Sequence, residues 1–319
     1  MGQFVVGVDV GGQTSKIGVV DARGEILAQT VIRSDIYGAD ANAFLSALAE
    51  AIKGCIAQSG KEGDIRGVGV GAPNGNYYTG EVGYAPNLAW AATQSVKFAE
   101  ILSGYLGGLP VSLTNDANAA AVGEMTYGAA RGMKNFIMIT LGTGVGSGIV
   151  IDGKVVYGHD GFAGELGHTT IVRNNGRACN CGRTGCLEAY CSAIGVAKTA
   201  REWLEFSDEE SLLRKVENIT SKDVYDAAKA GDKLALKVFE YTGNLLGTAF
   251  ADFIAFSAPE AIVLFGGLAR SKEFLQEPME KAMNDKVLGI WKNKVKIVFS
   301  SLKESDAAIL GASALAWEL

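Results

Sequence analysis

Short apolar runs alternate with glycine and acidic turns at the start of the chain. The segment FVVGVDVGGQTSKIGVVDARGEILAQTVI, residues 4–32, places Val and Ile at strand spacing on either side of a Gly-Gly turn and again after an Asp-containing turn. A similar pattern returns from residue 135 as NFIMITLGTGVGSGIVIDGKVVYG, with a glycine turn and then an Asp-Gly turn. Two copies of one strand pattern, about 130 residues apart, predict two related α/β lobes. Chance similarity between two glycine-rich hairpins is the alternative.

Helical patterns fill the segments between these strands. Residues 40–58 place Phe44, Leu48, Ile52 and Cys55 on one helical face, so we expect Cys55 to be a packing residue. A strand-like PVSLTN precedes a helix that starts at Asp116. Further on, AIVLFGGLARSKEFLQEPMEKAMND predicts a strand, a glycine pair and a helix.

Length and composition favour a globular protein of two lobes. The chain has 319 residues, which exceeds the roughly 250–300 residues at which one core stops growing. Its net charge of −6, with scattered lysines and arginines, lacks the electrostatic signature of a nucleic-acid binder. The N-terminus has no pattern of an export signal, and the uncharged stretch from residue 135 contains too many Gly and Thr residues for a membrane span. We therefore expect a cytoplasmic protein with reduced thiols, and neither nucleic acid nor membrane as a partner.

Three of the five cysteines lie within eight residues. Cys179, Cys181 and Cys186 follow His168, which precedes the first of them by eleven positions. Three thiolates and an imidazole form the full ligand set of a closed, structural zinc site. A disulfide is disfavoured because Cys-x-Cys closes too short a ring and leaves one thiol over. A redox thiolate pocket is the remaining alternative, and Cys191 is expected to serve packing.

Each predicted lobe also offers a glycine turn whose backbone N–H groups can approach a phosphate. These turns are DVGGQT at 9–14 and GTGVGS at 142–147. Neither has the spacing of a Walker A loop or of a dinucleotide fingerprint, and tight hairpins also need glycine. Asp9 at the mouth of the first turn is the kind of group that handles Mg²⁺, directly or through water.

Together with APNLAW, TNDANAA, GELGH and CNCGRTGCLEAY, these motifs resemble the ROK family of sugar kinases, within the actin-like, ribonuclease-H-like ATPase superfamily, from residue 5 to about 315. The resemblance implies a two-lobed α/β fold with the ligand cleft between the lobes. A small lobe, 1–115, would be completed by a C-terminal helix, 304–319, and a large lobe, 116–303, would carry the zinc site.

The resemblance further implies an ATP-dependent hexokinase that phosphorylates the 6-hydroxyl of glucose, commonly as a homodimer. Kinases for fructose or N-acetylmannosamine share these motifs. A sugar-responsive repressor of the same family is disfavoured, because strand pattern begins at Phe4 and leaves no room ahead of it for a DNA-binding segment.

By the same resemblance, Asp116 is the catalytic base. Its position at a helix start should favour the ionised carboxylate, and a capping carboxylate is the structural alternative. The positions implied to contact the sugar are Gly75, Asn87, Asn115, Asp116, Glu165, His168 and Glu188. The positions implied to contact ATP and Mg²⁺ are Asp9, Gly11, Gly12, Gln13, Thr14, Lys16, Gly142, Thr143, Gly144, Gly146, Gly266 and Gly267.

Two positions depart from the family pattern, in which Thr directly follows Gly-Gly and Pro-Gly is contiguous. Here Gln13 follows Gly12, with Thr14 one place later, and Asn74 separates Pro73 from Gly75. We further expect His168 to bind zinc through one ring nitrogen and to offer the other to the sugar, and Trp90 to be a core residue.

Overall fold

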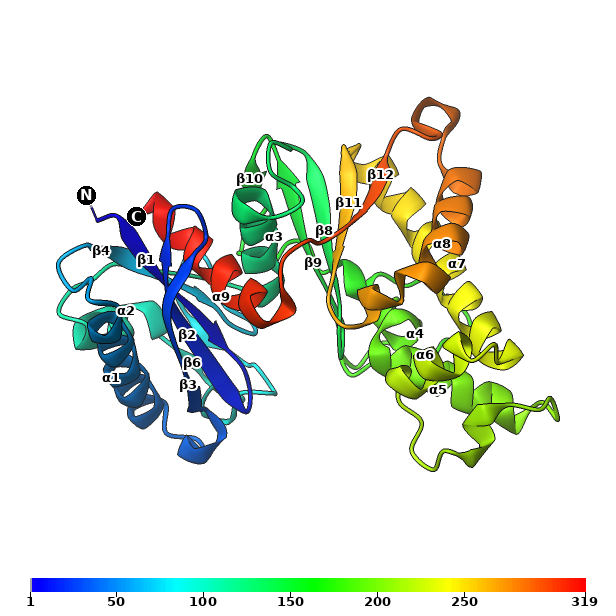
Figure 1. Ribbon diagram of the computed structural model, residues 1–319, viewed down its shortest axis with the longest axis horizontal. Helices are drawn as coiled ribbons and strands as arrows, with labels where there is room; N and C mark the ends of the chain where they lie inside the picture. The colour runs from blue at the N-terminus through cyan, green and yellow to red at the C-terminus, as the bar shows by residue number, and fades with distance from the viewer. Residues whose placement is uncertain (1) are drawn as a thin grey trace. The chain divides into compact units, whose positions relative to one another are not determined.

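The computed structural model describes residues 2–319, which form two compact units (Figure 1). The first comprises residues 2–133, 153–164 and 301–319, and the second comprises residues 134–152 and 165–300. This division differs from the predicted one, which placed residues 116–133, 153–164 and 301–303 in the second lobe. The reason is packing, because the helix that begins at Asp116 lies against the C-terminal helix of the first unit.

A five-stranded sheet forms the centre of the first unit. Its strands are β1 (Phe4–Val10), β2 (Thr14–Asp21), β3 (Ile26–Arg33), β4 (Ile65–Gly71) and β7 (Val111–Thr114), in the order β3-β2-β1-β4-β7. The first three strands are antiparallel neighbours, and β4 and β7 continue the sheet in parallel with β1. The predicted strand, glycine turn and strand pattern of residues 4–32 is thereby confirmed.

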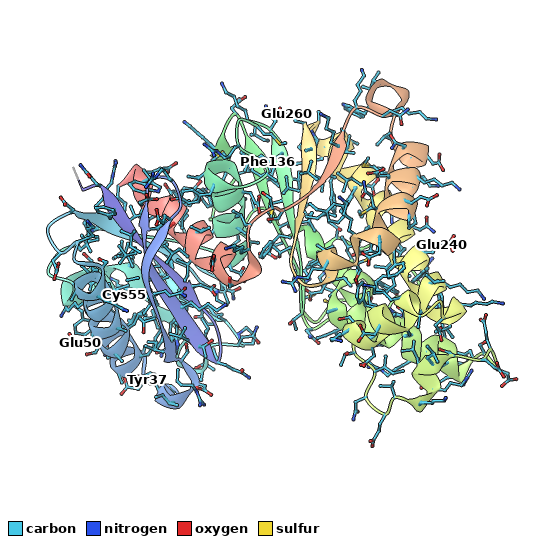
Figure 2. All side chains as sticks on the ribbon, viewed as in Figure 1. Tyr37, Glu50, Cys55, Phe136, Glu240 and Glu260 are labelled. Atoms are coloured by element: carbon cyan, nitrogen blue, oxygen red, sulfur yellow. The ribbon has the colours of Figure 1, made fainter. Side chains whose placement is uncertain are left out.

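One face of this sheet packs against α1 (Ala41–Ser59) and α2 (Phe98–Tyr105). Helix α1 begins where Asp40 accepts the N–H of Ala43 and ends at Gly60, which has a φ of 65°. Cys55, labelled in Figure 2, lies in this core, as the sequence predicted. Trp90 is also buried there and stacks on Phe44, which confirms its place in the core.

The opposite face is covered by α3 (Asp116–Tyr127) and α9 (Glu304–Leu315). Helix α9 lies so close to the sheet at two strand glycines that no side chain would fit there, while Val5 and Val20 pack against Ile309 and Leu310 of the helix. A Cβ added at Gly69 would lie 1.9 Å from the carbonyl oxygen of Ala312, and one at Gly7 would lie 2.1 Å from that of Ile309. The two short strands β5 (Val82–Gly83) and β6 (Ser95–Val96) form a separate ladder in the same unit.

The second sheet repeats the topology of the first. Its strands are β8 (Phe136–Leu141), β9 (Val145–Ile151), β10 (Lys154–Val155), β11 (Ala261–Phe265) and β12 (Lys296–Phe299), in the order β10-β9-β8-β11-β12. In both sheets the first and second strands form a hairpin across a glycine turn, and the fourth strand runs parallel to the first. This correspondence confirms the internal repeat predicted from the sequence.

Helices of the second unit enclose its core. They are α4 (Glu188–Cys191), α5 (Ala193–Glu205), α6 (Ser221–Lys229), α7 (Lys233–Ser257) and α8 (Lys272–Lys286). Helix α7 buries Phe239, Leu246 and Phe250 against the sheet. Glu260, labelled in Figure 2 near Phe136, fixes the entry into β8 by accepting the N–H groups of Lys134 and Asn135. Within residues 2–319, no helix is both long and apolar enough to cross a lipid bilayer.

Candidate functional site

The first glycine turn connects β1 to β2 and lies against the segment that contains Asn87. The N–H of Gly11 donates to the carbonyl oxygen of Thr14 at 3.0 Å. A Cβ added at Gly12 would lie 2.5 Å from the carbonyl oxygen of Asn87, so only glycine permits this approach. The side chains of Gln13, Thr14 and Asn87 are exposed. Both candidates for the phosphate contact, Gln13 and Thr14, are therefore available to a ligand.

Two carboxylates and a lysine gather beside this turn. Asp9 is paired with Lys16 across the β1–β2 ladder, and Asp116 is close enough to act on Asp9 electrostatically. Burial first, and then the negative charge of Asp116, raise the pKa of Asp9 to about 6, against the opposing effect of Lys16. Such a pair of perturbed carboxylates is a frequent feature of catalytic sites.

Asp116 occupies the first position of α3. The capping role considered for it belongs to Asn115, whose side chain accepts the N–H groups of Ala117 and Asn118 at 2.8 and 3.2 Å. Asp116 also accepts the N–H of Ala117, yet its pKa is raised because desolvation outweighs this bond. The sequence-based expectation that the helix start would lower the pKa of Asp116 and favour its ionised form is wrong, because the pKa is raised. The carboxylate is still reached by solvent, as a group that meets a substrate must be.

Gly75 lies directly beside the strand end that leads to Asn115. A Cβ at Gly75 would stand 2.5 Å from the carbonyl oxygen of Thr114. The neighbouring Asn74 has a φ of 53°, and its side-chain amide donates to the carbonyl oxygens of Gly83 and Tyr84. The extra residue in the family pattern is thus accommodated by a left-handed turn that is bonded in place.

The second glycine turn, between β8 and β9, is bonded to Glu188. The N–H of Gly142 donates to the carbonyl oxygen of Gly144 at 3.0 Å, and the N–H of Val145 donates to Oε2 of Glu188 at 2.9 Å. A Cβ at Gly144 would lie 2.4 Å from the same Oε2 atom. Nothing in the sequence pattern indicated this contact, because it joins residues 43 positions apart.

The rest of this turn is positioned by its neighbours. Gly146 donates its N–H to the hydroxyl of Thr140 at 3.1 Å, and the Thr143 side chain is exposed. Gly266 has a φ of 108°, and a Cβ there would meet the carbonyl oxygen of Leu141 at 2.5 Å, so this glycine lies at the end of β8. Gly267 caps the short helix that follows, Leu268–Ser271.

The segment that carries Glu165 and His168 is held on β9. The N–H of Leu166 donates to the Ser147 hydroxyl at 2.9 Å, and a Cβ at Gly167 would lie 1.9 Å from the carbonyl oxygen of Val145. The exposed Glu165 precedes the 3₁₀ helix Leu166–His168. Strand β9 therefore holds the segment of Glu165 and His168 through Ser147 and the close approach of Gly167 to Val145. The same strand binds Glu188 through the N–H of its first residue, Val145.

The predicted zinc ligands come together. The ligand atoms of His168, Cys179, Cys181 and Cys186 all lie within 4.8 Å of one another. The sulfurs of Cys181 and Cys186 are 3.7 Å apart, and Nδ1 of His168 is 3.7 Å from the Cys179 sulfur. Zn–S bonds of about 2.3 Å place two sulfurs of a tetrahedral site about 3.8 Å apart, so the four groups fit this metal. The cysteines are free thiols, and Cys191 is buried elsewhere as a packing residue.

The ring orientation of His168 and the position of Glu188 link the cluster to the predicted sugar contacts. Because Nδ1 faces the Cys179 sulfur, Nε2 is the ring nitrogen left for another partner. Oε1 of Glu188 lies 3.7 Å from the same sulfur. A metal bound by these residues would hold the segments of His168 and Glu188 together.

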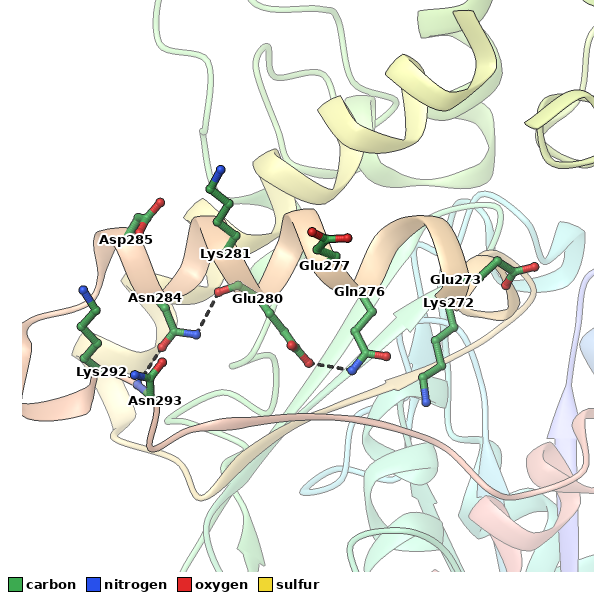
Figure 3. Close-up of a pocket in the computed structure, with 10 residues that line it drawn as sticks. All are labelled: Lys272, Glu273, Gln276, Glu277, Glu280, Lys281, Asn284, Asp285, Lys292 and Asn293. Carbon is green, nitrogen blue, oxygen red and sulfur yellow. Dashed lines mark hydrogen bonds between the residues drawn. The ribbon is translucent and has the colours of Figure 1, made fainter. Parts of the chain in front are cut away.

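A hollow on the outer surface of α8 contains none of these residues (Figure 3). Three of its polar side chains, Gln276, Glu280 and Asn284, bond to neighbouring residues of the same surface. Gln276 donates to Glu280 at 2.7 Å, and Asn284 donates to the carbonyl oxygen of Glu280 at 2.9 Å and accepts the N–H of Asn293 at 2.7 Å. This surface is a polar face of the second unit that lies apart from the residues of the candidate site.

Comparison with known proteins gives one consistent result. A sequence model described as the ROK family matches residues 5–318. A glucokinase from Halalkalibacterium halodurans is 38% identical over 285 residues, which is 88% of this chain and 84% of that protein.

Solved structures that resemble this chain belong to the same family. A ROK family glucokinase from Streptomyces griseus, in complex with glucose and AMPPNP, is 32% identical with a TM-score of 0.79, over 99% of this chain and all of that one. A ROK family transcriptional regulator, a homologue of the E. coli MLC protein, is 28% identical with a TM-score of 0.88, and the match covers this whole chain and 78% of the regulator.

Proposed function

Because the chain belongs to the ROK family, we propose that it is an ATP-dependent glucokinase that transfers the γ-phosphoryl group to the 6-hydroxyl of glucose. The observation that carries the proposal is the group of Asp9, Lys16 and Asp116 at the mouth of a glycine turn. It combines a candidate base, a candidate metal-handling carboxylate and a backbone suited to phosphate within one compact unit. The similarity to a glucokinase that binds glucose and an ATP analogue supports the same conclusion.

In the proposed reaction, Asp116 accepts the proton of the sugar hydroxyl while that oxygen attacks the γ-phosphorus. Its raised pKa suits this task, because a stronger base accepts a proton more readily. Phosphoryl transfer needs chiefly positioning and charge neutralisation. The proposed phosphate contacts are Lys16 and the N–H groups of the turns at 11–14 and 142–146. Asp9 is the proposed Mg²⁺ contact, and Mg²⁺ would neutralise phosphate charge.

The proposed glucose contacts are Gly75, Asn87, Asn115, Glu165, His168 and Glu188. Amide and carboxylate groups bond to adjacent hydroxyls, and this pairing gives a polar site its selectivity. Nε2 of His168 is proposed to bond to the sugar while Nδ1 faces the metal. The zinc itself would be structural, because four protein ligands leave no open position for water.

The test is an ADP-release assay with glucose, mannose, fructose and N-acetylated hexoses, applied to the wild type and to Asp116→Asn. We expect glucose to give the highest kcat/KM, and the variant to lose at least about 100-fold in kcat because no base remains. Calorimetry should still detect glucose binding to the variant. As a matched control, Asp64→Asn changes an exposed turn carboxylate of the same unit and should retain full activity. Near-normal turnover by Asp116→Asn would reject the assigned base.

The similarity to a transcriptional regulator supports one alternative, a sugar-responsive repressor. A gel-shift assay with operator-length DNA distinguishes the two functions, since a kinase of acidic net charge should give no shift. The homodimer stays a prediction, to be checked by light scattering coupled to gel filtration.

A further inference from the structure

Arg177 lies two positions before the first cysteine of the zinc cluster and is largely withdrawn from solvent. Its side chain is 11% exposed. Nε and Nη2 bind the carboxylate of Glu202 on α5, the first at 3.0 Å. Nη1 donates to the hydroxyl of Thr199 at 2.9 Å. This arginine therefore uses both edges of its guanidinium group, which a lysine cannot do.

The same side chain reaches the two residues that follow Glu188. Nη1 also lies 3.3 Å from the carbonyl oxygen of Ala189, and the guanidinium carbon lies 4.5 Å from the centre of the Tyr190 ring. The Arg177 backbone N–H donates to the Tyr190 hydroxyl at 2.8 Å. Helix α4, which begins at Glu188, is thus bonded to Arg177 by a main-chain and a side-chain contact.

The residues on both sides of Glu188 are therefore fixed by separate sets of contacts. On its N-terminal side, Cys186 belongs to the zinc cluster, and Leu187 donates its N–H to the carbonyl oxygen of Thr169 at 3.0 Å. On its C-terminal side, Ala189 and Tyr190 contact Arg177. Of these contacts, only the one made by Cys186 depends on a bound metal ion.

We propose that Arg177 is a positioning residue that keeps Glu188 in place for the sugar, and that it acts separately from the zinc ion. The proposal rests on the assigned role of Glu188 in glucose binding. The carboxylate of Glu188 must meet a sugar hydroxyl while it accepts the N–H of Val145, so a small displacement of α4 disturbs both contacts.

The experiment compares Arg177→Gln, Arg177→Lys and Glu202→Gln with the wild type. A matched control is Arg173→Gln, which makes the same change at an exposed arginine of the same loop. The measurements are KM for glucose and for ATP, kcat, zinc per chain, and hydrogen exchange of the amides of residues 188–191.

For Arg177→Gln we expect KM for glucose to rise about 10-fold, with a smaller change in kcat, because bonds to a charged group are lost. Zinc per chain should stay at the wild-type value, and the amides of α4 should exchange faster. The glucose KM of Arg177→Lys should lie between those of Arg177→Gln and the wild type, because lysine keeps the positive charge but lacks the paired N–H donors of the guanidinium group. Arg173→Gln should match the wild type.

Unchanged glucose KM in a folded Arg177→Gln protein would overturn the proposal, and so would a loss of zinc that parallels the rise in KM. Should Arg177→Gln fail to fold, Arg177→Lys and Glu202→Gln decide the question by the same measurements. If the wild type phosphorylates no sugar, the proposed function fails, whereas the exchange rates of α4 at constant zinc content still test the positioning role.

Discussion

Replacing Gly144 by alanine tests whether the contact between the second glycine turn and Glu188 matters for activity. The added Cβ would lie 2.4 Å from Oε2 of Glu188, and a distance under 3.0 Å is essentially never seen for a real Cβ atom. Either the carboxylate moves away or the turn shifts. The carboxylate is the end of a flexible side chain and is the group that moves more easily, and we expect its movement to break the 2.9 Å bond between the Val145 N–H and Glu188.

The magnitude follows from the kind of bond that is lost. A hydrogen bond to a charged group contributes about 1.5–3 kcal/mol, and each 1.4 kcal/mol is a factor of about ten. If the bond supports the reactive arrangement, kcat/KM for glucose should fall roughly 10- to 100-fold. Because the same turn is a proposed phosphate contact, KM for ATP should rise as well.

Gly142→Ala is the matched control, since a Cβ there would meet no protein atom within 4 Å. It should leave KM for glucose unchanged, and any effect should be confined to ATP. Steady-state kinetics with each substrate varied in turn, together with thermal unfolding of both variants, separates these results. If Gly144→Ala keeps wild-type kinetics, the bond between Val145 and Glu188 has no functional role and this reasoning is refuted.

Three further predictions concern pH, metal and packing. Because burial raises the pKa of Asp9 to about 6 and this proposed Mg²⁺ contact must be ionised, kcat/KM of the free enzyme should fall as the pH is lowered through about 6, and the raised pKa of Asp116 acts in the same direction; a flat profile down to about pH 5 would contradict this. Cys181→Ala should lose bound zinc and weaken glucose binding measured by calorimetry, whereas Cys55→Ala should keep its zinc; normal glucose affinity in Cys181→Ala would reject the structural role of the metal. Gly69→Ala should lower the free energy of unfolding by about 1–3 kcal/mol in urea titrations, because its Cβ would overlap the carbonyl oxygen of Ala312, whereas Gly54→Ala on α1 meets no atom and should be neutral or stabilising.

The features predicted well from the sequence are those encoded by neighbouring residues. The hairpins around Gly11–Gly12 and Gly142–Gly144 could be predicted because alternating Val and Ile residues and glycine turns are local signals. The cysteine cluster could be predicted because its ligands are close in sequence and chemically distinctive.

The features that were missed depend on contacts between distant segments. Arg177 was not singled out, because its importance comes from Glu202 and Tyr190, which only the packing of α4 and α5 brings near. The pKa of Asp116 was expected to follow its helix position, which is a local property, but the burial that raises it is set by the whole fold.

The predicted boundary at residue 115 has the same kind of error. A helix start at Asp116 could be recognised from the sequence, but the partner of that helix could not. Gly123 of α3 approaches Gly311 of α9 so closely that an added Cβ would lie 2.6 Å from the Gly311 Cα. Residues nearly two hundred positions apart thus decide to which unit α3 belongs.

The late position of α9 in the chain has a consequence for synthesis. During translation the strands of the first sheet leave the ribosome early. The sheet face around Gly7 and Gly69 stays uncovered until residues 309–312 of α9 have been made. The second unit contains no residue beyond 300, so the first unit is the last to receive all of its residues. A nascent chain of this kind should expose a glycine-lined, apolar sheet face to chaperones until translation ends and α9 leaves the ribosome.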